Sequence, residues 1–129
     1  MRVTLATGGL EGLQAETVVL PAFEDGWQDE PLVERLDGQL GGMLREHGQA
    51  GRIASKPNRV TTVLAPGDGR IRRVLVIGAG SRESWDATRA RQYAGTAVRE
   101  LRTARVTEAA VALPRVGEPQ ANVAAAVHG

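Results

Sequence analysis

The stretch that most constrains the fold of this chain runs from Arg72 to Arg105. It contains the apolar run Val74-Leu75-Val76-Ile77, which leads into Gly78-Ala79-Gly80-Ser81 and then into a long helical pattern. A short apolar run without alternation, bounded by turn residues, is typical of a strand buried on both faces. Because a helix follows directly, this stretch is half of a βαβ unit and predicts a parallel sheet around it.

The composition indicates one domain with an aliphatic core. The chain has 129 residues, only four of them aromatic and none of them cysteine. The lack of cysteine excludes disulfides and thiolate metal sites and favours a reducing compartment. No apolar run approaches the roughly 20 residues that span a bilayer, and the N-terminus lacks a signal-peptide pattern. We therefore expect a cytoplasmic, soluble protein.

The net charge of +1 hides an uneven distribution. Residues 1–37 contain eight acidic and two basic residues, whereas residues 45–105 contain thirteen basic and five acidic ones. An arginine-rich half can bind nucleic acid, but it can equally face solvent, a neighbouring domain or another subunit. We favour the second interpretation and treat nucleic acid as the less favoured partner.

The first half of the chain predicts two strands and one helix. The strands cover residues 3–6 and 17–23, and Pro21 marks an edge, a bulge or the end of the second strand. The helix begins at Pro31 and ends at Gly48, and one apolar face follows it at helical spacing. Three glycines weaken this helix by roughly 1 kcal/mol each. The face consists of Leu32, Leu36, Leu40, Met43 and Leu44.

The second half predicts a hairpin, a long helix and a further strand. Residues 60–65 form a strand, and a short Pro-Gly turn joins it antiparallel to the run at Val74, so the sheet is mixed. Asp86 is the expected N-cap of the long helix. The next strand covers residues 108–113. A final helical pattern at 123–127 is cut off by the end of the chain, which suggests a truncated protein. The buried stripe of the long helix consists of Ala90, Ala94, Ala97, Val98 and Leu101, with Tyr93 beside it.

The segment Gly78-Ala79-Gly80-Ser81 is the strongest candidate for a ligand site. It follows a buried strand, as the dinucleotide-binding fingerprint does, but that fingerprint needs a third glycine where this chain has Glu83. An acidic side chain there would face the pyrophosphate. We therefore predict a tight turn instead of a nucleotide site.

The other polar residues form no recognisable constellation. His47 and His128 are the only histidines and are not spaced as a metal-binding pair. Ser81 and Ser84 lack the Gly-x-Ser-x-Gly context of a nucleophile, and the carboxylates cluster in turns and at a helix start, where they have structural uses. We predict no catalytic, no cofactor-binding and no metal-ligating residue in residues 1–129.

An ordered set of short motifs resembles the N-terminal domain of the leucyl (cytosol) aminopeptidase family. Each motif is weak alone, but together they cover nearly the whole chain. One departure is His128-Gly129, where the family usually has Glu-Gly. The motifs are residues 18–24, residues 36–42, the Gly48 to Gly51 turn with Arg52, the stretch 73–80, the alanine-rich helix 90–101, the strand end 112–114 and residues 124–129.

The resemblance implies a macro-domain-like fold, that is, a mixed sheet flanked by helices in three α/β/α layers. It also implies that residues 1–129 are a single accessory domain, and that a C-terminal metallopeptidase domain with two Zn or Mn ions is absent from this chain. The implied role is oligomer assembly, in a hexamer, or regulation. The alternative is a stand-alone macro-like module that binds a nucleotide, ADP-ribose or nucleic acid.

Overall fold

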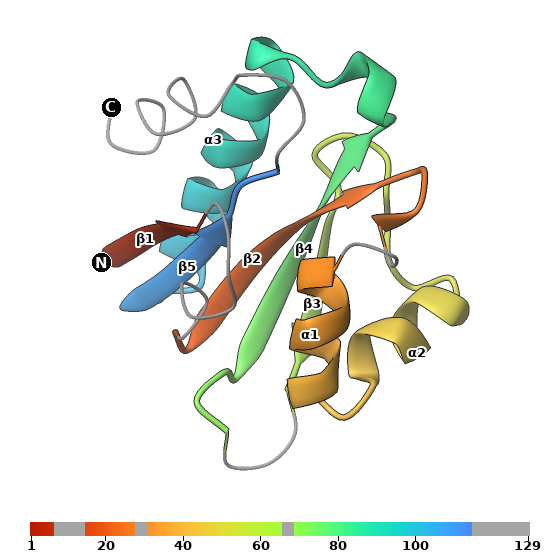
Figure 1. Ribbon diagram of the computed structural model, residues 1–129. Helices are drawn as coiled ribbons and strands as arrows, with labels where there is room; N and C mark the ends of the chain where they lie inside the picture. Colours follow the sequence, from red (N-terminus) through yellow and green to blue (C-terminus); the bar gives the residue numbers. More distant parts are fainter. Residues whose placement is uncertain (7–14, 28–30, 66–68, 115–129) are drawn as a thin grey trace.

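A computed structural model gives the fold and describes residues 1–6, 15–27, 31–65 and 69–114. Two strands, two helices, two further strands, a long helix and a last strand follow one another along the chain, which gives an α/β domain (Figure 1). The elements are β1 (Arg2–Ala6), β2 (Thr17–Phe23), α1 (Pro31–Gln39), α2 (Met43–Gln49), β3 (Val60–Leu64), β4 (Arg73–Gly80), the 3-10 turn η3 (Arg82–Ser84), α3 (Ala87–Thr103) and β5 (Glu108–Ala112). The terminal helical pattern at 123–127 lies outside the described residues.

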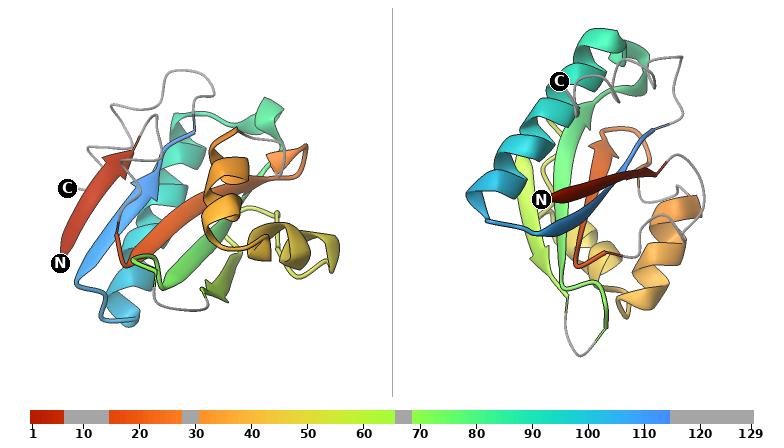
Figure 2. Two further views of the ribbon diagram at one scale, coloured as in Figure 1. Left: turned by 60° about the horizontal axis from the view of Figure 1, so that its bottom comes forward. Right: turned by 90° about the vertical axis from the view of Figure 1, so that its left-hand side faces the viewer.

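The five strands form one sheet in the order β1-β5-β2-β4-β3. The pairs β1–β5, β5–β2 and β2–β4 are parallel, and β3 is antiparallel to β4. Helices α1 and α2 cover one face of this sheet and α3 covers the other (Figure 2). The predicted mixed sheet in three α/β/α layers is therefore confirmed, including the antiparallel hairpin of β3 and β4.

The centre of the sheet consists of β2 and β4, which are buried on both faces. From Val74 to Gly80 every residue of β4 is buried, as the uninterrupted apolar run predicted. Pro21 lies inside β2, just before a bulge at Ala22 and Phe23. The pairing of β2 with β5 ends earlier, at Val19. On the β5 side Pro21 therefore interrupts no ladder, which explains why a central strand tolerates it.

The predicted single helix over residues 31–48 is wrong. The chain breaks after Gln39 into α1 and α2, because Gly41 and Gly42 adopt left-handed φ angles of +67° and +84°. The apolar spacing continued through the break and concealed it, since Leu36, Leu40 and Leu44 are all buried in the core. Gly41 and Gly42 therefore do not weaken a continuous helix, as predicted, but provide a turn with φ angles that L side chains rarely adopt.

Asp37 of α1 stabilises the start of α2 across this break. Its carboxylate Oδ1 accepts hydrogen bonds from the backbone N–H groups of Leu44 at 2.8 Å and Arg45 at 3.2 Å. Gly42, which precedes α2, has no side chain that could cap it. Asp37 is only 8% exposed, so these N–H groups depend on its carboxylate instead of on water.

We expect the substitution Asp37→Ala to lower the free energy of unfolding by about 1–2 kcal/mol, because it leaves two N–H groups at a helix start without their acceptor. Urea unfolding followed by circular dichroism measures this change. Glu34→Ala is the matched control, because Glu34 only forms an exposed ion pair with Arg45 at 3.7 Å and its loss should cost a few tenths of a kcal/mol. Equal losses in the two variants would contradict the capping role of Asp37.

Helix α3 begins and packs as predicted, with one difference. Asp86 caps it, since its side chain accepts a hydrogen bond from the N–H of Arg89 at 2.8 Å. Ala90, Ala94, Ala97 and Leu101 are buried, whereas Val98 is only half-buried. Thr96 is buried in addition, so the buried face is centred on Tyr93 and Ala97 rather than on the side of Val98.

In the described ranges no helix is long and apolar enough to cross a membrane.

Candidate functional site

The carboxyl end of the parallel strands is the first place to look for a site in this fold. The chain leaves β2 toward α1 on one face of the sheet and leaves β4 toward α3 on the other face (Figure 1). Open α/β sheets bind ligands outside such a point, where the connections diverge between neighbouring strands. Here the point lies between Phe23, the last residue of β2, and Gly80, the last residue of β4.

The glycines at this end form backbone contacts with the preceding loop. Gly78 N–H donates to the carbonyl of Arg59 at 2.7 Å, and Gly80 N–H donates to the carbonyl of Ser55 at 2.9 Å. The carbonyl of Gly78 accepts from the N–H of Asn58 at 2.9 Å. Both glycine N–H groups are thus satisfied by carbonyl groups and are not free to bind a phosphate.

The predicted tight turn over residues 78–81 requires a correction, because β4 continues through Gly80. Of the two glycines in this segment, only Gly80 has a left-handed φ angle, of +73°. Gly78 is needed for a different reason, since a Cβ there would overlap the carbonyl oxygen of Lys56. The glycines therefore allow a close approach between a strand and a loop, which is a known use of glycine within strands.

The ends of β2 and β4 are also held together directly. The N–H of Glu24 donates to the carbonyl of Gly80 at 2.9 Å. Arg82 donates twice to Asp25, from its N–H to the carboxylate Oδ1 at 3.1 Å and from its side-chain Nε to the carbonyl at 3.0 Å. The guanidinium of Arg82 lies 4.7 Å from the centre of the Phe23 ring, within the range of a cation–π contact. These contacts join the ends of β2 and β4 at the point where a ligand would be expected.

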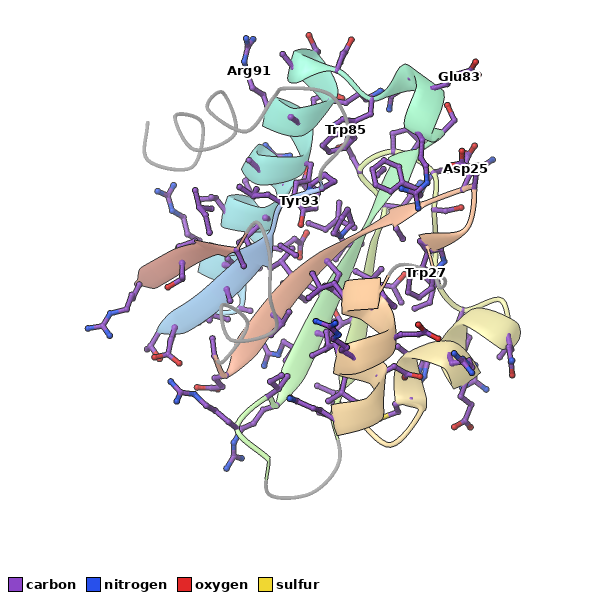
Figure 3. The ribbon with its side chains drawn as sticks, in the orientation of Figure 1. Asp25, Trp27, Glu83, Trp85, Arg91 and Tyr93 are labelled. Carbon is purple, nitrogen blue, oxygen red and sulfur yellow. The ribbon has the colours of Figure 1, made fainter. Side chains whose placement is uncertain are left out.

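Three of the four aromatic side chains, those of Phe23, Trp85 and Tyr93, pack together near this end of β2 and β4. Figure 3 shows Trp85 and Tyr93. Trp85 packs edge-on against Phe23 with ring centres 5.4 Å apart and against Tyr93 with centres 6.0 Å apart. The Nε1 of Trp85 is buried without a hydrogen-bond partner among the described residues. Because these rings come from β2, from the residue that follows η3 and from α3, sequence spacing could not reveal the cluster. The scarcity of aromatic residues was the one signal available.

The hydroxyl of Tyr93 lies where β2 and β5 separate. It is 2.6 Å from the carbonyl of Ala112, to which it donates, and 3.5 Å from the carbonyl of Val19. Burial raises the pKa of the Tyr93 hydroxyl well above its usual range, because the charged phenolate would be desolvated. A phenol that stays neutral and donates to the backbone serves the packing of the sheet.

The remaining polar candidates have structural partners. Ser81 caps η3 by accepting from the N–H of Ser84 at 3.3 Å. His47 lies in the last turn of α2, and its Nδ1 is 2.9 Å from the carbonyl of Met43. His128 lies outside the described residues. In the four described ranges no three His, Asp or Glu side chains come together in a way that could hold a metal ion. That this domain supplies no catalytic, cofactor-binding or metal-ligating residue stays a prediction.

A family model described as "Cytosol aminopeptidase family, N-terminal domain" matches residues 11–129. The chain belongs to this family. The resemblance found in the sequence is thereby confirmed, and the family comprises hydrolases named for their peptidase activity.

Curated relatives with this name are much longer than the present chain. A probable cytosol aminopeptidase of Geobacter sulfurreducens is 33% identical over 107 residues, which are 82% of this chain and 22% of that protein. One of Solibacter usitatus is 28% identical over 129 residues, the whole of this chain and 25% of that protein. The chain thus spans a quarter or less of these two relatives.

Two solved structures confirm the fold. A mutant of tomato leucine aminopeptidase superimposes with a TM-score of 0.73 at 17% identity, covering 99% of this chain and 27% of that one. The macrodomain of DarG from Mycobacterium tuberculosis superimposes with a TM-score of 0.70 at 11% identity, covering 95% of this chain and 85% of the macrodomain chain. At such identities the likeness concerns architecture alone, and it confirms the macro-domain-like fold.

Proposed function

We propose that residues 1–129 are the non-catalytic N-terminal accessory domain of a metal-dependent leucyl aminopeptidase. The full-length protein would remove N-terminal amino acids from peptides in the cytoplasm. The observation that supports this proposal most is the family match over residues 11–129 together with relatives about four times longer than this chain. The domain would be one part of a larger enzyme whose remaining length contains the chemistry.

The two divalent metal ions, Zn or Mn, would be bound by a C-terminal domain of the same polypeptide. The described residues do not fit a dinuclear site, which needs several converging carboxylates or histidines. The accessory domain would serve the assembly of a homo-oligomer, a hexamer by resemblance, or its regulation. Among the described residues, the contacts of Glu24 and Asp25 with Gly80 and Arg82 stabilise the domain at the carboxyl ends of β2 and β4.

This proposal predicts that residues 1–129 release no leucine from a leucyl substrate, with or without Zn²⁺ or Mn²⁺, whereas the full-length protein releases it with metal. The measurement is a chromogenic assay on both proteins at equal molar concentration. The reading frame downstream of residue 129 should encode the Lys, Asp and Glu metal ligands. Metal-stimulated hydrolysis by residues 1–129 alone, or a stop codon directly after residue 129, would overturn the proposal.

The alternative function is a macro-like module that binds ADP-ribose, another nucleotide or nucleic acid. Its support is the architecture alone, which the chain shares with a macrodomain over 85% of that macrodomain chain. The backbone partners of the Gly78 and Gly80 N–H groups argue against a phosphate there. Calorimetric titration separates the two functions, because heat of binding with ADP-ribose is expected only for the module.

A further inference from the structure

The edge strand β3 has none of the features that normally prevent a sheet from pairing with another chain. It lies outside β4 at the margin of the sheet (Figure 2), and among the described strands it pairs with β4 alone. Its sequence, Val60-Thr61-Thr62-Val63-Leu64, contains no charge, glycine or proline. Exposed edges without charges, proline or bulges are templates for further strand pairing.

The register of β3 shows which of its backbone groups are free. Ala65 donates its N–H to the carbonyl of Arg72 at 2.9 Å, so this position is hydrogen-bonded to the β4 side. Because such positions alternate in an antiparallel ladder, the N–H and C=O groups of Val60, Thr62 and Leu64 point away from β4. In the part of the chain that the structure describes, no loop or helix bonds to these groups.

The side chains of the same three residues also favour association. They share one face of the strand, on which Val60 is half-buried and Thr62 is exposed. Leu64 is 66% exposed and is one of two exposed large hydrophobic residues among those described. The opposite edge differs, because β1 begins with the exposed charge of Arg2.

We propose that β3 pairs antiparallel with β3 of a second copy of this chain, around a two-fold axis at Thr62. The free groups then meet in three hydrogen-bonded pairs: Val60 with Leu64 of the copy, Thr62 with Thr62, and Leu64 with Val60. The strand is self-complementary because it places an aliphatic pair at each end, a Thr–Thr pair in the middle and no like charges opposite each other. The result is one continuous sheet through both copies.

This inference deepens the assembly role proposed above and names a surface for it. We choose a second copy as the partner because its β3 matches the uncharged, symmetric pattern of this strand, which an arbitrary peptide need not do. The nearest charges, Arg59 and Arg73, have the same sign, so charge attraction does not hold the two edges together. Salt should therefore leave the association intact, unlike contacts between arginine and carboxylate groups.

Cross-linking tests the register directly, because the chain has no cysteine of its own. Paired residues lie about 5.5 Å apart at a hydrogen-bonded position, which suits a disulfide. We expect Thr62→Cys to form a disulfide dimer at least about tenfold faster than Thr4→Cys under mild oxidation. Thr4 is the matched control, an exposed threonine on the opposite edge strand β1. Equal cross-linking rates would overturn the proposal.

Sedimentation of the 129-residue chain provides a second test. The apparent mass should rise with protein concentration, and this rise should persist in about 0.5 M salt. Thr62→Pro should abolish the rise, because proline removes an N–H that points away from β4. Leu64→Lys should weaken it without any change to the backbone, and it keeps the test valid if the proline variant fails to fold. A chain that stays monomeric, or an association that salt dissolves, would overturn β3 pairing. The mass is independent of peptidase activity, so this result and that of the aminopeptidase assay are separate.

Discussion

The substitution Gly78→Ala is expected to lower the free energy of unfolding by about 3 kcal/mol, since overpacking of a closed contact typically costs 1–3 kcal/mol and lost hydrogen bonds add to it. The new Cβ would overlap the carbonyl oxygen of Lys56 and lie 2.8 Å from the carbonyl carbon of Ser55. These atoms are backbone and cannot rotate away as a flexible side chain can. The loop must move, which breaks the hydrogen bonds of Gly78 with Arg59 and Asn58. Thermal unfolding should show a midpoint lower by roughly 10 °C.

Gly95→Ala is the matched control for this prediction. Gly95 lies within α3, and a Cβ there would only make an ordinary contact of 3.6 Å with the side chain of Arg99. This variant should gain about 0.5–1 kcal/mol, because alanine has the higher helix propensity. If Gly78→Ala were as stable as the wild type, the loop would not be seated on β4 as the structure shows.

The strands could be predicted from the sequence because their signals are local. The apolar run at Val74 is buried on both faces, as expected, and the pattern over 17–23 forms the strand that it predicted. The N-cap at Asp86 is equally local, since it needs only one side chain and the N–H three residues later. In these cases the residues that form the element also determine it.

The features that escaped prediction depend on residues far apart in the sequence. The local pattern at Gly78 predicts a turn, because the carbonyl of Lys56, which lies against Gly78, cannot be identified from that pattern. The contacts of Asp25 with Arg82 span 57 positions. The break between α1 and α2 was missed for another reason, since the apolar spacing on either side of Gly41 and Gly42 remained in phase. Long-range backbone contacts thus shape the candidate site, and they have no counterpart in composition or periodicity.

Tyr93→Phe is expected to lower the free energy of unfolding by about 1–3 kcal/mol at neutral pH, because it leaves a buried carbonyl without its donor. The Tyr93 hydroxyl donates to the carbonyl of Ala112 at 2.6 Å and Tyr93 is 1% exposed. Ser84→Ala is a suitable control. Its hydroxyl lies on the exposed turn η3 and, among the described residues, forms hydrogen bonds only with Ser81, at 2.9 and 3.0 Å. The variant should therefore change the free energy of unfolding by a few tenths of a kcal/mol.

The difference between wild type and Tyr93→Phe should shrink at alkaline pH. Burial raises the pKa of Tyr93 in the folded state, whereas in the unfolded chain it titrates near its usual value of about 10. Below pH 10 both states hold the proton and the stabilisation is complete. Above pH 10 the unfolded state loses its proton first, so wild-type stability falls by about 1.4 kcal/mol per pH unit. The phenylalanine variant lacks this slope, because Tyr93 is the only tyrosine of the chain. Urea unfolding between pH 8 and 11 measures both proteins, and parallel curves above pH 10 would show that Tyr93 is not buried as a neutral phenol.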